Sequence, residues 1–141
     1  MVALRIQRHY REQQLATAGC GQLVMLAYDG MIRALTDAAR AMREHRCEAQ
    51  NDAILRAQDL LLALLSSLDR SAHPRLADNL ERLYRFLFDR LTWANVSDDE
   101  AALRTVTAML ADLRDAWAEA ERLRRSPLYV IPSPTDERVT A

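Results

Sequence analysis

Lysine is absent from this sequence of 141 residues, and all 19 basic residues are arginine. Glycine and proline are scarce: three glycines and four prolines occur, and three of the prolines lie after residue 126. Because glycine and proline destabilise helix interiors, the middle of the chain has the composition of a helical protein. Half of the residues are apolar, which argues against disorder and allows one domain with a buried core.

Long apolar runs and an excess of one charge are also missing. The longest apolar run, Leu60–Leu65, is far shorter than the ~20 residues that span a bilayer. The N-terminal residues hold no apolar core of signal-peptide length. The net charge of −1 excludes a large general attraction to nucleic acid but leaves a local basic patch open. We therefore expect a soluble, cytoplasmic protein with no nucleic-acid partner and no insertion into a membrane.

Residue types that carry catalysis or bind metals are few and scattered. The three histidines, His9, His45 and His73, have no carboxylate or cysteine at ligand spacing, and we expect them to be solvated. Cys20 and Cys47 form no metal or redox spacing, so a reducing compartment is expected. No Glu-x-x-His pair, phosphate-binding loop or serine elbow occurs. The sequence predicts no catalytic residue, no cofactor and no metal site.

Four segments carry apolar residues at helical spacing. The first three cover residues 22–44, 48–69 and 74–95, and Pro74 suits the first position of the third. The fourth is expected to follow a capping box formed by Ser97 and Glu100 and to run to residue 125. Short links between the segments predict an all-α, antiparallel up-and-down four-helix bundle. Its seam in the last helix consists of Leu103, Val106, Leu110, Leu113, Trp117 and Ala120.

The distribution of glycine and proline divides the chain into three expected parts. Residues 1–20 are expected to be a flexible N-terminal arm or cap helix, because Gly19 and Gly21 separate them from the first long helix. Residues 21–125 are expected to form the bundle. Residues 126–141, which contain three prolines, are expected to be a disordered C-terminal tail.

The third helix carries more apolar surface than a bundle position requires. Its apolar arc is about 220° wide, whereas a usual stripe is somewhat more than 100°. One interpretation is that the excess is core or is covered by the N-terminal arm. The other is that it lines grooves for an amphipathic partner segment. The arc is centred on Leu76, Leu80, Leu83, Leu87 and Ala94, with Tyr84 and Phe88 on one flank and Phe86 and Trp93 on the other, whereas Arg82, Arg85 and Asp89 are expected to form a solvated face.

Several short motifs follow one another in a fixed order along the chain. The first is LVMLAYDG at residues 23–30, and Ser67-Leu68-Asp69 follows it. The third predicted helix then carries Asn-Leu-x-x-Leu-Tyr at residues 79–84 and Arg-Leu-x-x-Ala-Asn at residues 90–95. A late Trp117 completes the order. Order and spacing together are far more specific than any single motif, and over about residues 6–120 they resemble the flagellin export chaperone family of the FliS type.

The resemblance implies an antiparallel four-helix bundle that is not an enzyme. Proteins of this family hold the disordered C-terminal segment of new flagellin in the cytoplasm, prevent early polymerisation and deliver flagellin to the type III export gate. The gate component FlhA is the second implied partner, and a weak homodimer stays open. An alternative from the residues alone is a non-enzymatic adaptor or regulator that binds a different amphipathic client; a ligand- or metal-binding bundle enzyme is a third reading.

The resemblance also places partner-binding residues. Tyr10 matches the family's N-terminal tyrosine, and Ile6 stands for the aliphatic residue before it, one position farther away than the family pattern has it. The family's Ser-Pro before the first helix is replaced by Gly19-Cys20, so we expect that helix to start late or fray. Together with the aromatic surplus, the predicted partner-binding set is Ile6, Tyr10, Leu23, Val24, Tyr28, Leu80, Tyr84, Phe86, Phe88, Arg90 and Trp93.

Overall fold

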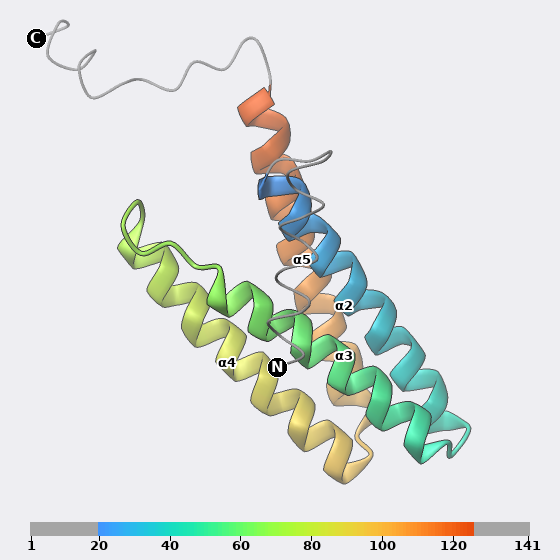
Figure 1. The fold of residues 1–141 in the computed structure, drawn as a ribbon. Helices are drawn as coiled ribbons and strands as arrows, with labels where there is room; N and C mark the ends of the chain where they lie inside the picture. The colour runs from blue at the N-terminus through green and yellow to red at the C-terminus, as the bar shows by residue number, and fades with distance from the viewer. Residues whose placement is uncertain (1–19, 126–141) are drawn as a thin grey trace, which may run out of the picture.

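The computed structural model describes residues 20–125, which form four helices joined by short turns (Figure 1). The predictions for the N-terminal arm and the C-terminal tail, with Ile6 and Tyr10, lie outside the described residues. Within these, no strand occurs and the all-α prediction is confirmed. The helices are α2 (Cys20–Arg43), α3 (Cys47–Ser66), α4 (Pro74–Ser97) and α5 (Glu100–Arg125).

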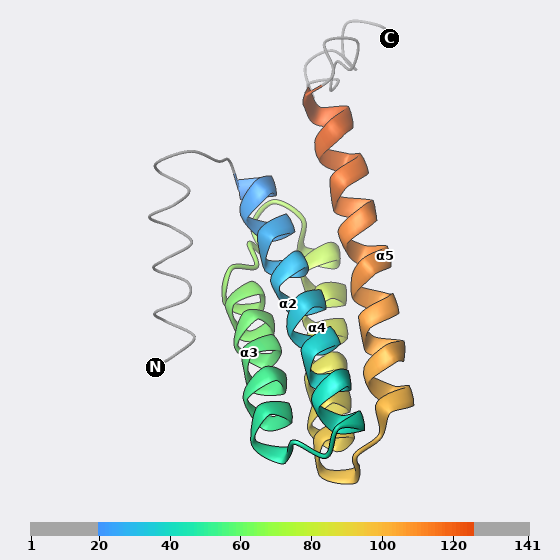
Figure 2. The same ribbon diagram turned by 90° about the vertical axis from the view of Figure 1, so that its right-hand side faces the viewer.

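The helices form an antiparallel bundle in which chain neighbours are neighbours in space. α2 contacts α3 and α5, α4 contacts the same two helices, and α2 and α4 lie diagonally across the bundle (Figure 2). The α2–α5 pair and the α3–α4 pair diverge toward the end that holds the α3–α4 turn (Figure 1). This divergence decides where side chains of the inner faces reach the surface.

The core is built from apolar residues at helical spacing on all four helices. The α5 seam was predicted correctly at Leu103, Val106 and Leu110, which are buried, while Leu113 and Trp117 are half-buried against the core. Ala120, the last predicted seam position, is exposed, because the helix pairs diverge at this end of α5. Alanines of α2 such as Ala34 and Ala38 are buried and let its neighbours approach closely. Removing a buried leucine from water stabilises the fold by about 1.5–3 kcal/mol, so these positions specify the bundle.

Helix boundaries differ from the prediction by a few residues. α2 begins at Cys20 rather than at residue 22, so the expected late start is wrong. α3 ends at Ser66 rather than at residue 69. The carboxylate of Asp69 instead accepts hydrogen bonds from the backbone N–H and the hydroxyl of Ser71, which closes a local turn. Pro74 is the first residue of α4, as predicted.

The α4–α5 connection corrects the predicted capping box. Ser97 is the last residue of α4, and its hydroxyl donates to the Trp93 carbonyl at 2.6 Å. The cap of α5 is Asp99, whose carboxylate accepts the Ala102 N–H at 3.0 Å. Between them Asp98 takes a left-handed conformation, with φ 51°. The carboxylate of Glu100 pairs with Arg43 of α2 at 2.5 Å.

Candidate protein-binding surface

An apolar groove opens where the two helix pairs diverge. We call it the end groove; its volume is about 200 Å³. Val24 contributes from α2, Leu64 from α3, Leu76 and Leu80 from α4 and Trp117 from α5. The remaining lining residues are Ser67, Leu68, Asp69, Ala72, His73, Ala77 and Tyr84. All four helices therefore present apolar side chains to one surface opening.

A second apolar opening lies between α3 and α4 and has a volume of about 270 Å³. Its apolar lining consists of Leu61, Leu62 and Leu65 of α3 and of Tyr84 and Phe88 of α4, with Arg85 and Asp89 at the rim. Tyr84 lines both this opening and the end groove. The two openings therefore meet at the side chain of Tyr84. A protein segment that lies across α3 and α4 can place side chains in both.

Large apolar side chains are also exposed along α4. Trp93 is 59% exposed and Phe86 is 51% exposed, while Leu76 at the rim of the end groove is 49% exposed. Val96 is exposed at the C-terminal end of the same helix. Isolated exposed apolar residues are normal in soluble proteins. Several on one helix mark a surface that a partner can cover.

A more polar pocket of about 750 Å³ lies between the start of α2 and the end of α5. Met25, Leu26 and Ala118 form its apolar part, and its other lining residues are Gln22, Asp29, Glu121, Arg122 and Arg125. Asp29 is held by the guanidinium of Arg114, whose Nε lies 2.9 Å from the carboxylate oxygen. This ion pair joins α2 to α5, so Asp29, a polar residue of the pocket lining, stabilises the contact between the two helices.

Two tyrosines of the predicted set are internal. Tyr28 is fully buried and Tyr84 is 2% exposed, and their hydroxyl oxygens lie 2.6 Å apart. Burial raises the pKa of both hydroxyls, and the proximity of Tyr28 raises that of Tyr84 further. Both side chains are therefore neutral throughout the physiological pH range, and they satisfy each other's polar group inside the bundle.

Two buried glutamines join α3 to α4. The side-chain amide of Gln58 donates to the Thr92 hydroxyl at 2.8 Å and to the Phe88 carbonyl at 3.2 Å. The amide of Gln50 donates to the carboxylate of Asp98 at 2.9 Å and to Asn95. Hydrogen bonds of this kind fix the register of two helices more than they add stability. Sequence reasoning missed both glutamines, because a polar residue at helical spacing is ordinarily solvated.

The structure separates the predicted partner-binding residues into three groups. Tyr28, Tyr84 and Leu80 are buried in the core, although Leu80 and Tyr84 also form the floor of the openings. Leu23, Val24 and Phe88 are half-buried, and Val24 and Phe88 pack against the core and line the openings. Phe86, Arg90 and Trp93 are exposed on α4.

Within residues 20–125, no group of three or more histidine, cysteine or acidic side chains is placed to hold a metal ion. The same residues contain no helix that is both long enough and apolar enough to cross a membrane. The described surface instead carries two apolar openings and several exposed apolar side chains, with a few charged side chains around them. Apolar openings between helices suit the side chains of an amphipathic segment of another protein.

Comparisons with known proteins identify the family. Residues 3–124 match the model of the family described as flagellar protein FliS. The chain is 28% identical over 116 residues to the flagellar secretion chaperone FliS of Bacillus subtilis, covering 82% of this chain and 86% of that protein. It is 30% identical over 121 residues to the flagellar secretion chaperone FliSB of Pseudomonas aeruginosa, with coverages of 83% and 96%.

A third relative is the flagellar secretion chaperone FliS of Escherichia coli. It is 30% identical to this chain over 110 residues, which cover 77% of this chain and 81% of that protein. The chain therefore belongs to the FliS family and is a flagellar export chaperone. The resemblance inferred from the motifs at residues 23–30 and 79–95 is confirmed.

Proposed function

We propose that this chaperone binds the disordered C-terminal segment of flagellin on its apolar openings and on the exposed face of α4. It acts in the cytoplasm, without catalysis, and keeps flagellin from polymerising before export. It then delivers flagellin to the type III export gate, where FlhA is the receiving component. Tyr10 and Ile6 contribute to these contacts from the N-terminal part of the chain.

The observation that carries the proposal is apolar surface left over by a bundle whose core is already closed. The helices bury Leu87, Leu91, Leu103 and Leu110 completely. The end groove and the exposed Trp93 remain outside that core. The wide apolar arc of the third predicted helix left core and groove as alternatives, and the exposed apolar side chains support the groove.

The dimensions of the surface suit a segment that folds on binding. Ordering a disordered chain reduces the gross interaction free energy by about 2–5 kcal/mol or more. One small pocket cannot offset that loss, but a series of apolar contacts along α3 and α4 can. The openings of about 200 Å³ and about 270 Å³ are each of a size to take one or a few side chains, as anchors along an extended or helical segment require.

Titration with a synthetic peptide of the flagellin C-terminal segment tests the proposal. Calorimetry should show saturable binding with a negative heat-capacity change, because apolar surface is removed from water. Circular dichroism should show a gain of helix that the separate components lack. A well-folded protein that binds no peptide at high micromolar concentration would contradict the proposal, and capture of a different flagellar protein from a cell extract would favour the adaptor alternative.

A further inference from the structure

One face of α4 is continuously exposed along nearly the whole helix. Its residues recur at intervals of four, three, four, four and three, so they lie on one side of the helix. Every one of them is exposed. We call this face the α4 stripe and define it as Arg75, Asn79, Arg82, Phe86, Arg90 and Trp93.

The α4 stripe contains three arginines and no carboxylate. Arg82 donates to the neutral amide oxygen of Asn79 at 2.8 Å and forms no ion pair with a residue of the described range 20–125. Arg90 makes no ion pair with any residue between 20 and 125. Phe86 and Trp93 lie between and beyond the arginines and are more than half exposed. Cations and aromatic rings therefore alternate along the stripe.

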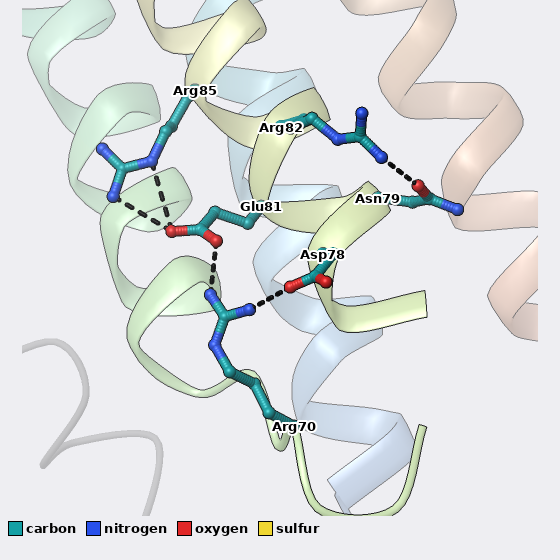
Figure 3. A network of polar contacts seen from close by, with 6 residues as sticks. All are labelled: Arg70, Asp78, Asn79, Glu81, Arg82 and Arg85. Atoms are coloured by element: carbon teal, nitrogen blue, oxygen red, sulfur yellow. Dashed lines mark hydrogen bonds and ion pairs between the residues drawn. The ribbon is translucent and has the colours of Figure 1, made fainter. Parts of the chain in front are cut away.

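Two of the three acidic residues of α4, Asp78 and Glu81, pair with arginines near the α3–α4 turn. The third, Asp89, lies at the rim of the opening between α3 and α4. Arg70 pairs with both Asp78 and Glu81, and Arg85 pairs with Glu81 at 3.1 Å (Figure 3). Figure 3 shows Arg82 and Arg85 extending in different directions, although the sequence had placed them on one solvated face. The carboxylates of Asp78 and Glu81 are thus paired with arginines near the α3–α4 turn. The arginines of the α4 stripe, in contrast, have no carboxylate partner within residues 20–125.

We propose that the α4 stripe docks an acidic amphipathic portion of the client, whose carboxylates bind Arg82 and Arg90 and whose apolar side chains cover Phe86 and Trp93. The proposal rests on the proposed function and names the chemistry of the client segment on this face. A guanidinium presents a planar fork of donors that matches a carboxylate. Arg82 and Arg90 are eight residues apart, about 12 Å along the helix, so two acidic positions on two turns of a helical client can reach both.

Charge reversal with a matched control tests this inference. Arg82→Glu/Arg90→Glu changes two stripe positions, and Arg33→Glu/Arg104→Glu makes the same change in net charge on exposed positions of α2 and α5. Both are titrated with the flagellin C-terminal peptide at about 50 mM and about 500 mM NaCl. The stripe variant should bind about tenfold more weakly at low salt. Its affinity should rise with salt, whereas that of the parent falls.

A second peptide, in which every Asp is replaced by Asn and every Glu by Gln, separates the ionic contribution from the apolar one. This peptide should bind the parent protein and the stripe variant with equal affinity, because the ionic contribution is gone. Equal weakening by the stripe and control variants would overturn the inference and leave the proposed function standing. Absence of any binding by the parent protein would instead refute the proposed function. Circular dichroism melting of both variants separates either result from loss of fold.

Discussion

The hydroxyl oxygens of Tyr28 and Tyr84 lie 2.6 Å apart in the interior, although the two residues are 56 positions apart in sequence. Each tyrosine is the hydrogen-bond partner that the other needs inside an apolar core. The backbones of α2 and α4 do not approach each other in the described bundle, because the two helices lie diagonally across it. The tyrosine pair therefore joins the two helices that the topology keeps apart.

Removing one of these hydroxyls should destabilise the protein. Tyr28→Phe leaves the Tyr84 hydroxyl buried without its partner, and the free energy of unfolding should fall by about 1–3 kcal/mol. The double Phe variant should lose less than the sum of the single variants, because no buried hydroxyl is then left unpaired. Urea denaturation measures both values. Additive losses would show that the two hydroxyls are not coupled.

The corrected cap predicts different effects at two neighbouring positions. Asp99→Ala removes the side chain that accepts the Ala102 N–H and should reduce the free energy of unfolding by about 1 kcal/mol. Ser97→Ala removes only a hydroxyl that bonds back to the preceding turn of α4, and its effect should stay within about 0.5 kcal/mol. Thermal or urea denaturation compares them, and a larger effect at Ser97 would restore the capping box read from the sequence.

Glu121 should contribute a pH-dependent share of stability. Its carboxylate lies against Gly21 at the start of α2 and pairs with Arg124 and Arg125. The Arg124 hydrogen bond leads the contacts that lower its pKa below the ordinary value of 4.5. Because the folded-state pKa is the lower one, the stabilisation is complete above the unfolded-state pKa and is lost as pH falls through the folded-state pKa.

Glu121→Gln measures this share directly. The variant should be less stable than the parent at about pH 7, and the difference should shrink toward zero at about pH 3. Urea midpoints at the two pH values give the comparison. Glu119→Gln is the matched comparison. Among residues 20–125 Glu119 pairs with Arg122, which lowers its pKa too, but both side chains are exposed, so its pH-dependent difference should be smaller than that of Glu121→Gln. A Glu121→Gln difference that persists unchanged in acid would indicate a packing effect and not an ionic one.

The end groove can be tested with two leucines of nearly equal exposure. Leu76 lines the groove and is 49% exposed, whereas Leu55 of α3 is 47% exposed and lines none of the described openings. Leu76→Asp should weaken binding of the flagellin peptide about tenfold or more by placing a charge where an apolar anchor docks. Leu55→Asp should leave affinity unchanged. Equal affinity of the two variants would remove the end groove from the binding surface.

The bundle was predictable because its signals are local. The seam at Leu103, Val106 and Leu110 follows from spacing within one helix, and Pro74 marks a helix start by its own chemistry. Spacing does not say which two neighbours a helix has, or where they diverge. Tyr28 and Tyr84 were therefore placed in a groove as contacts, whereas the structure buries their hydroxyls against each other.

The exposure of Phe86 and Trp93 could not be predicted either, because it depends on which side of α4 the neighbouring helices cover. Phe86 and Trp93 lie on a flank of the α4 arc that no neighbouring helix covers, and a helical wheel alone left core and groove as alternatives. The Ser97 cap was misplaced because α4 continues to that residue. The side-chain amide of Gln50 in α3 donates hydrogen bonds to Asn95 and Asp98 at this end of α4, a contact between helices that spacing within one helix does not indicate.

The two tryptophans of the chain lie on different surfaces: Trp117 lines the end groove and Trp93 belongs to the α4 stripe. Intrinsic fluorescence therefore reports on each surface without an added label. In a Trp93→Phe variant the emission comes from Trp117 alone, and in Trp117→Phe from Trp93 alone. Following the blue shift of each during mixing with client would reveal whether the two surfaces are occupied at once or one after the other.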